Sequence, residues 1–226
     1  TEGQVVIVDA GSGIRNLGKA LYRETSLSDI RIFFTHAHWD HLVGFPFFEP
    51  AYYNHYNITF CSGPHGQKLI RKFLSRQMEA PHFPIDFSYL KAKFNFRCEH
   101  QRDNGDCPYG SMKIRALPLS HPNGGYGYKF IEDEKTFVFL TDNELGFKHE
   151  GGLTREQYIE HCHGADLLLH DAQYTSEKYE RTRGWGHSTY VDTLDLAIKA
   201  EVARLGLFHH DPDRTDADLD RQVDFC

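Results

Sequence analysis

The sequence has few cysteines and no long apolar run, and each absence excludes a class of protein. Five cysteines are widely spaced among 226 residues (Cys61, Cys98, Cys107, Cys162 and Cys226), and this odd number does not suit a disulfide framework. We therefore expect reduced thiols and a cytoplasmic location. We expect neither a signal peptide nor a membrane anchor, because no apolar stretch reaches the length of a membrane-spanning helix.

The sequence also lacks an excess of basic residues. It has 25 lysines and arginines against 32 aspartates and glutamates, which gives a formal net charge of −7. Nucleic-acid-binding domains usually carry a basic stripe, and none is visible here. The acidic balance does not exclude a small anionic substrate held by metal ions, because bound cations dominate the local field.

Histidine, in contrast, is abundant, with 15 residues. The stretch "THAHWDH" at 35–41 follows the apolar run "IRIFF" and contains His36, His38, Asp40 and His41. Alternate residues leaving a strand point the same way, so His36 and His38 can hold one cation. Asp40 and His41, on the following turn, can face a second cation. Imidazole and carboxylate together suit zinc, manganese or iron.

Short β-rich runs alternate with helical stretches along the chain, as in an α/β protein. The expected strands are Val5–Val8, Ile30–Phe34, Ile58–Cys61, Met112–Leu119, Thr136–Leu140, Leu167–Leu169 and Gly206–Phe208. The expected helices cover residues 14–24, 66–77, 154–162 and 188–201, with Ser188 as the N-cap of the last. Residues 78–108, rich in Pro, Phe and His, break this rhythm and are expected to form an insertion near the surface.

Five expected strands are each followed by a histidine or an aspartate. The histidine-rich stretch is one case, and the others are His121, Asp142, Asp171 and His209. Strand ends along one edge of a sheet are rigid supports for a site, whereas long loops are not. This repetition predicts that the residues work together. "GSG" at 11–13 could bind phosphate, but a tight strand-to-helix turn is the favoured interpretation.

The pattern His-x-His-x-Asp-His after a strand resembles the hallmark of the metallo-β-lactamase superfamily. "VDAGSGIRNLGKAL", "LSHPNGGYGYKF", "FLTDNE", "LLLHDAQY", "GWGHSTY" and "LFHHDP" are similar to further segments of that family, in the same order. The resemblance implies a four-layer αββα sandwich formed by residues 1–226 as a single domain. It also implies that N-terminal strands of the fold are missing, because the chain reaches the strand before "DAG" at once.

Within the superfamily, the chain most resembles the ribonuclease Z-like and cyclic-phosphodiesterase branch. There an acid pairs with the histidine of "GHST", and Asp171 and His187 match these positions. The acid of ribonuclease Z is usually glutamate, so the shorter Asp171 is a departure. Ribonuclease Z enzymes that mature transfer RNA often carry an arm between the third histidine and the bridging aspartate. His121 and Asp142 are too close in sequence for such an arm, which weighs against transfer RNA as the substrate.

The resemblance also implies a role for each residue. His36, His38 and His121 would hold one ion, Asp40, His41 and His209 would hold a second, and Asp142 would bridge them. His210 is an alternative to His209. The family pattern favours His209, because the family's ligand lies three residues before a proline, which is Pro212 in this chain. Two divalent ions, zinc first and manganese or iron as alternatives, would share a hydroxide that attacks phosphorus. Asp40, His187 and Asp171 would be the catalytic residues, with His187 oriented by Asp171.

The expected function is therefore metal-dependent hydrolysis of a small or cyclic phosphodiester. A lactonase or β-lactam hydrolase is the alternative, because one fold hosts many reactions. A non-catalytic metal-binding protein is a third reading, disfavoured because all seven expected ligands are present. No membrane partner is expected, and a homodimer is left open.

Overall fold

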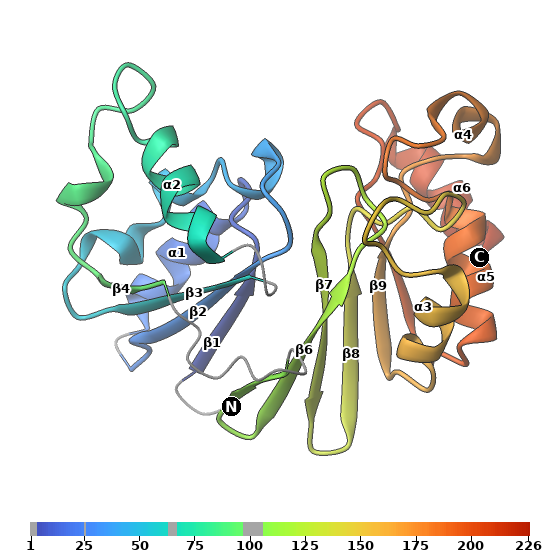
Figure 1. Ribbon diagram of the computed structural model, residues 1–226, viewed down its shortest axis with the longest axis horizontal. Helices are drawn as coiled ribbons and strands as arrows, with labels where there is room; N and C mark the ends of the chain where they lie inside the picture. Colours follow the sequence, from blue (N-terminus) through green and yellow to red (C-terminus); the bar gives the residue numbers. More distant parts are fainter. Residues whose placement is uncertain (1–3, 25, 63–66, 97–105) are drawn as a thin grey trace. The chain divides into compact units, whose positions relative to one another are not determined.

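The computed structural model describes residues 4–24, 26–62, 67–96 and 106–226 (Figure 1). The chain divides into two compact units, Thr1–Met112 (unit 1) and Lys113–Cys226 (unit 2). Each unit has its own cluster of buried hydrophobic side chains. Among the described residues, no helix is both long and apolar enough to cross a membrane.

Unit 1 alternates short strands and helices. Its strands are β1 (Gln4–Val8), β2 (Asp29–Phe34), β3 (Asn57–Ser62), β4 (Lys93–Asn95) and β5 (Asp106–Tyr109). Its α-helices are α1 (Ile14–Arg23) and α2 (Gln67–Gln77), and its 3₁₀ turns are η1 (Trp39–His41), η2 (Phe45–Phe47), η3 (Glu49–Tyr52) and η4 (Phe87–Tyr89). Strands β1 to β4 form a parallel sheet in the order β1-β2-β3-β4.

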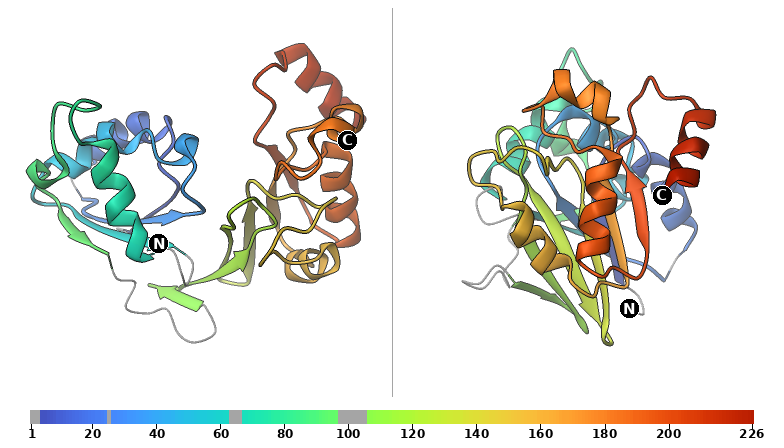
Figure 2. Two further views of the ribbon diagram at one scale, coloured as in Figure 1. Left: turned by 45° about the horizontal axis from the view of Figure 1, so that its top comes forward. Right: turned by 90° about the vertical axis from the view of Figure 1, so that its right-hand side faces the viewer.

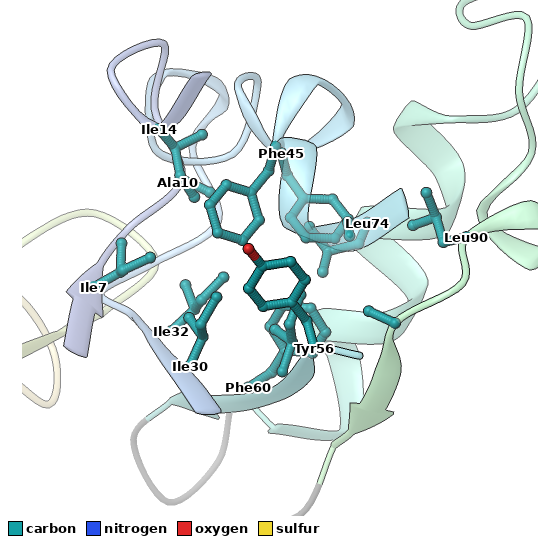
Figure 3. Close-up of a cluster of buried hydrophobic side chains, with 14 of the residues drawn as sticks. Ile7, Ala10, Ile14, Ile30, Ile32, Phe45, Tyr56, Phe60, Leu74 and Leu90 are labelled. Carbon is teal, nitrogen blue, oxygen red and sulfur yellow. The ribbon is translucent and has the colours of Figure 1, made fainter. Parts of the chain in front are cut away.

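The core of unit 1 is packed on this sheet. Ile30, Ile32 and Phe60 are buried on β2 and β3, and alternate residues of a strand share a face. Figure 3 shows them in one cluster with Phe45 from η2 and Leu74 from α2. This packing fixes the carboxyl end of β2, where the histidine-rich stretch begins.

The described part of the expected insertion contributes several side chains to the core of unit 1. Met78 is fully buried and Phe87 is nearly so, both in the core cluster. Strand β4 pairs with β3 through Ile58 and Phe94 and forms the edge of the sheet. Most residues between Met78 and Leu90 are exposed, Tyr89 among them, so the position expected for 78–108 near the surface stays a prediction. Residues 97–105, which include Cys98, lie outside the described residues.

Unit 2 combines antiparallel and parallel strands. Its strands are β6 (Met112–Pro118), β7 (Tyr126–Glu132), β8 (Lys135–Leu140), β9 (Leu167–Asp171) and β10 (Leu205–Phe208), in the order β10-β9-β8-β7-β6. The β6-β7 and β7-β8 pairs are antiparallel, whereas β8-β9 and β9-β10 are parallel. Its helices are α3 (Arg155–Cys162), α4 (Ser176–Thr182), α5 (Tyr190–Lys199) and α6 (Asp216–Phe225).

Helices α3 and α5 contact each other, and α5 also contacts β9 and β10 (Figures 1 and 2). Tyr158 of α3 and Leu196 of α5 are fully buried with Val138 and Leu168 of the sheet. Close packing of this kind makes the strand ends of unit 2 firm supports for side chains. The carboxyl ends of β8, β9 and β10 lead directly to Asp142, Asp171 and His209.

Each helix of unit 2 begins after a threonine. The hydroxyl of this threonine accepts a hydrogen bond from the backbone N–H three residues later, at Thr154, Thr175, Thr189 and Thr215. Such caps satisfy amides that would otherwise lack a partner. The expected cap at Ser188 is therefore wrong by one residue. The Ser188 hydroxyl instead donates to the carbonyl of Asn143 and accepts from the amide of Leu145, over 2.5 and 3.0 Å.

The expectation of a mixed α/β protein with two sheets is confirmed. All seven expected strands and all four expected helices are present, with ends displaced by up to two residues. Three strands and two helices were not expected, namely β4, β5, β7, α4 and α6. The single-domain expectation for residues 1–226 stays a prediction.

Candidate metal and catalytic site

The predicted site residues fall into two sets, one in each unit. The set in unit 1 is His36, His38, Asp40 and His41. The set in unit 2 is His121, Asp142, Asp171, His187 and His209. Asp171 is the last residue of β9, and every other member follows a strand or lies in a loop that hydrogen bonds tie to a strand end.

In unit 1, three imidazole rings gather at the end of β2. The ring centroid of His36 lies 4.4 Å from that of His38 and 4.2 Å from that of His41. The carboxylate of Asp40 lies beside them, with Oδ2 at 3.1 Å from Nε2 of His41. His41 is buried, whereas the Asp40 side chain is 62% exposed. The loop therefore presents nitrogen and oxygen donors together within a few ångströms.

Asp9, which was not predicted as a site residue, anchors this loop. Its Oδ1 accepts from the Thr35 amide over 2.8 Å, and its Oδ2 accepts from the Thr35 hydroxyl over 2.8 Å and from Nδ1 of His41 over 2.7 Å. Burial raises the pKa of the Asp9 carboxyl, and the hydrogen bonds from His41 and Thr35 oppose that rise. Asp9 thus fixes the His41 ring and leaves Nε2 as its second nitrogen.

The "GSG" stretch supports the loop through close backbone contacts. A Cβ on Gly44 would lie 2.0 Å from the carbonyl oxygen of Gly11, and one on Gly11 would lie 2.5 Å from that of Asp40. The amide of Ala10 also donates to the carbonyl of His41 over 2.7 Å. These contacts favour the tight-turn interpretation, because the glycines allow two backbone segments to touch.

In unit 2, the two oxygens of Asp142 face different histidines. Oδ2 lies 3.8 Å from Nε2 of His121, and Oδ1 lies 3.3 Å from Nε2 of His209. The Asp142 side chain is only 3% exposed, and the Thr141 hydroxyl donates to Oδ1 over 2.7 Å. A carboxylate placed in this way can contact two cations at once. His210, the alternative ligand, is exposed.

His187 lies beside this group and is held by Asp171. Its Nδ1 lies 2.6 Å from Oδ2 of Asp171, and its ring stacks on that of His209 at 4.8 Å. One ligand atom from each of Asp142, Asp171, His187 and His209 lies within 4.8 Å of the others. This part of the site therefore combines a paired histidine with candidate metal ligands.

Asp9 and two of the predicted site residues have strained backbones. The φ angles of Asp9, Asp142 and His209 are 62°, 51° and 53°, in the left-handed region that non-glycine residues rarely adopt. Such a conformation costs on the order of 1–3 kcal/mol and persists where the surroundings impose it, often at functional sites. Here it directs each side chain from a strand end toward the neighbouring histidines.

Hydrogen bonds also select the imidazole nitrogen that is available in each ring. Nδ1 of His121 lies 2.9 Å from the carbonyl of Gly186, which can only accept, so Nδ1 carries the proton. Nδ1 of His41 faces Asp9 in the same way. When these rings are neutral, Nε2 bears the lone pair, which is the arrangement of zinc-binding histidines. The donor set therefore fits divalent transition metals such as zinc.

Glu144 is a second residue that sequence reasoning missed. Glu144 lies two residues after Asp142 in the sequence and is buried. Its carboxylate accepts hydrogen bonds from the loop that leads to His187. Asp9 follows a predicted strand directly, a signal that could have identified it. Glu144 offered no such signal, because the loop amides that it accepts from lie about 40 residues away in sequence.

Comparison with known proteins identifies the family. Residues 4–210 match the sequence model described as the β-lactamase superfamily domain. The chain belongs to this superfamily. The matched range includes every predicted site residue, from His36 to His209, so the resemblance first seen in the histidine motif extends along the chain. The superfamily expectation and its hydrolase activity are confirmed at this level, and membership implies the use of divalent metal ions.

Several relatives of this superfamily member are named ribonuclease Z. The protein of Haloarcula marismortui is 24% identical over 256 residues, which cover 92% of this chain and 77% of the relative. That of Thermoplasma acidophilum is 26% identical over 250 residues, which cover 94% and 79%. These alignments span both units.

Two solved structures have the same fold as this chain. The metallo-β-lactamase fold protein YhfI from Bacillus subtilis has a TM-score of 0.64 at 16% identity, over 97% of this chain and 80% of its own. The short form of human tRNase Z has a TM-score of 0.64 at 21% identity, over 94% and 84%. The expected metallo-β-lactamase fold is therefore confirmed.

These relatives contradict the expected partners. A small phosphodiester as substrate, and the argument against transfer RNA, conflict with relatives named ribonuclease Z and tRNase Z. The net charge misled because it sums the whole surface and does not report the field at one site. The residues between His121 and Asp142 do form a short hairpin, β7-β8. The lack of an arm there leaves all the predicted site residues in the chain.

Proposed function

We propose that the chain is a metal-dependent nuclease that hydrolyses a phosphodiester bond of RNA, with transfer RNA transcripts as its substrates. The observation that carries the proposal is the His187–Asp171 pair beside Asp142, in a chain that ribonuclease Z relatives cover almost completely. Phosphodiester cleavage requires a proton for the leaving oxygen, and a paired histidine can supply it.

His187 is the proposed proton donor. Its Nδ1 is bonded to Asp171, so a proton on Nε2 is the one available for transfer. Asp171 is fully buried and accepts further hydrogen bonds from the amides of Gln173 and Ser188, over 3.1 and 3.2 Å. These bonds hold the carboxylate still, so the orientation of His187 is set before substrate binds.

The proposed ligands of the first ion are His36, His38 and His121, and those of the second are Asp40, His41 and His209. Asp142 is the proposed shared ligand. Bound ions would supply Lewis acidity and lower the pKa of a water molecule. Zinc is the first choice, since imidazole and carboxylate suit it.

A cytoplasmic location belongs to the same proposal. The cysteines in the described part of the chain, Cys61, Cys107, Cys162 and Cys226, are free thiols. Free thiols of this kind are typical of a reducing compartment.

The test is cleavage of an extended transfer RNA transcript by the purified, zinc-loaded chain. A linear RNA of equal length, bis-p-nitrophenyl phosphate, a lactone and a cephalosporin are assayed in parallel. We expect cleavage of the transcript at a defined position, lost in His187→Ala and kept in the exposed control His163→Ala. Hydrolysis of the lactone or the cephalosporin without cleavage of any RNA would overturn the proposal.

A further inference from the structure

Glu144 is a buried carboxylate that the proposed reaction does not use directly. Its side chain is 0% exposed. Oε1 accepts from the Tyr179 hydroxyl over 2.6 Å and from the Gly184 amide over 2.7 Å. Oε2 accepts from the Gly186 amide over 2.7 Å and lies 2.8 Å from Nε2 of His149. Burying a carboxylate is costly unless donors surround it, and here four donors do so.

Two of these donors belong to the loop that leads into His187. Gly184 and Gly186 have φ angles of 87° and 99°, which glycine adopts readily. A Cβ on Gly186 would lie 2.1 Å from Nδ1 of His121, so the loop passes directly against this ring. The loop is therefore confined between Glu144 on one side and His121 on the other.

A single residue, Gly186, connects Glu144 with two site residues. Its amide donates to Glu144, its carbonyl accepts from Nδ1 of His121 over 2.9 Å, and the next residue is His187. If the amide lost its partner, the peptide could rotate and its carbonyl would leave His121. The rest of the loop has separate anchors, because Ser188 is bonded to Asn143 and Leu145.

We infer that Glu144 is a positioning residue that fixes the Gly184–Gly186 loop and thereby orients the rings of His121 and His187. The inference rests on the proposed function for the roles of these two histidines. Its structural part, that Glu144 maintains the bond from His121 to Gly186, stands on the geometry alone. Loss of the Glu144 carboxylate should disturb these two rings while the fold of unit 2 persists.

The first test is NMR of the purified chain labelled with ¹⁵N-histidine. The Nδ1–H of His121 should exchange slowly in the wild type and rapidly in Glu144→Ala and Glu144→Gln. The side chain introduced by Glu144→Gln has the same size as the glutamate, but its amide group has only one acceptor oxygen and cannot accept from the amides of both Gly184 and Gly186. The Nδ1–H of His170, bonded to the carbonyl of Asp171 over 2.7 Å, is the internal reference and should stay protected.

The second test is a comparison of kcat and KM on the transcript that the wild type cleaves. Mutating a residue that orients a metal ligand typically lowers activity by about 10–100-fold. We expect this loss in kcat for both Glu144 variants, with KM within about two-fold. The exposed control Glu180→Gln on α4, which removes the same charge, should behave as the wild type.

Two results would overturn the inference. One is a His121 Nδ1–H that stays protected in Glu144→Gln, because Glu144 would then not hold the loop. The other is loss of protection at His121 and His170 together, which would make Glu144 a general stabiliser of unit 2. A wild type that cleaves no RNA would overturn the proposed function instead, since the NMR test needs no substrate.

Discussion

Nδ1 of His187 lies 2.6 Å from Oδ2 of Asp171, and this carboxylate is fully buried. The resemblance to the family predicted this pair from the sequence, and the structure places the two side chains in contact. Because backbone amides hold Asp171, the imidazole has one preferred orientation. In the proposed mechanism, His187 transfers the proton and other residues of the site hold the metal ions.

Replacing His187 with alanine should therefore abolish turnover without emptying the site. We expect kcat for RNA cleavage to fall by about 10²–10⁴-fold, the usual contribution of a positioned acid–base group. Asp171→Asn should lower it less, because the ring would remain with a poorer orientation. Steady-state kinetics and elemental analysis of both variants test this. Loss of metal from His187→Ala would instead make His187 a ligand.

Asp142→Ala should lose both metal and activity. The two carboxylate oxygens face His121 and His209, so the change removes the proposed shared ligand. We expect fewer than two ions per chain by elemental analysis and no measurable RNA cleavage. Asp220→Ala on the exposed face of α6 is the matched control and should keep both. A fully active Asp142→Ala enzyme would show that the bridging assignment is incorrect.

Removing the metal should stop the reaction reversibly. The proposed ligands are too many for one tetrahedral ion, so the untreated protein should hold close to two ions per chain. A chelator should abolish cleavage, and added zinc should restore it. Zinc affinity should also fall on acidification, because imidazole binds metal only when neutral. Full activity after complete metal removal, checked by elemental analysis, would contradict a metal-dependent mechanism.

Asp9→Asn should weaken metal binding although Asp9 is not itself a proposed ligand. The carboxylate accepts from Nδ1 of His41 and from Thr35, and an amide would reproduce only part of this. Changes in such supporting residues typically lower metal affinity or activity by about 10–100-fold. Competition with a metal-binding dye measures the affinity, and the exposed variant Glu79→Gln serves as the control. Unchanged affinity would show that Asp9 does not orient His41.

The buried ring of His170 should make the fold sensitive to acid. Burial lowers its pKa below the ordinary 6.5, against a hydrogen bond to Asp171 that raises it. Below pH 6.5 the unfolded chain then binds more protons than the folded chain. The free energy of unfolding therefore falls as the pH drops. The full contribution of the neutral His170 ring to the free energy of unfolding is present above about pH 6.5. Below it, one proton changes this free energy by up to about 1.4 kcal/mol per pH unit.

His170→Gln should remove this part of the acid sensitivity. Denaturant unfolding of wild type and variant between about pH 5 and 7.5 measures it as the difference between the two slopes. Parallel curves for the two proteins would show that His170 does not contribute.

The predicted ligands could be selected from the sequence because each closely follows a strongly apolar strand. Asp142 comes after "FVFL" and His209 after "LGLF", so the end of each strand points to a candidate residue. The strands and helices followed from their alternating pattern, whereas the two-sheet fold followed from the resemblance to the superfamily. Residues that support the site from a distance were harder to see, because contacts such as Glu144 to Gly186 leave no local pattern.

The strands and helices that were not expected from the sequence also have a physical explanation. β7 contains Gly127, which disrupts an alternating pattern but is required because a Cβ there would lie 2.7 Å from the carbonyl of Phe139. Helices α4 and α6 are short and highly charged, and their clearest signals are the capping residues Thr175 and Thr215. The partner prediction failed because net charge and one missing arm are properties remote from the residues that act on the substrate.

The β7-β8 hairpin offers a position for engineering. Its turn consists of Asp133 and Glu134, both exposed and with φ angles of 47° and 63°, between the paired residues Glu132 and Lys135. Two positive φ angles are the signature of a tight hairpin turn. The turn joins the ends of the strands that point away from His121 and Asp142, roughly 20 Å along a strand of six residues. A fluorophore or an affinity tag could therefore be introduced there while both ligands keep their supports.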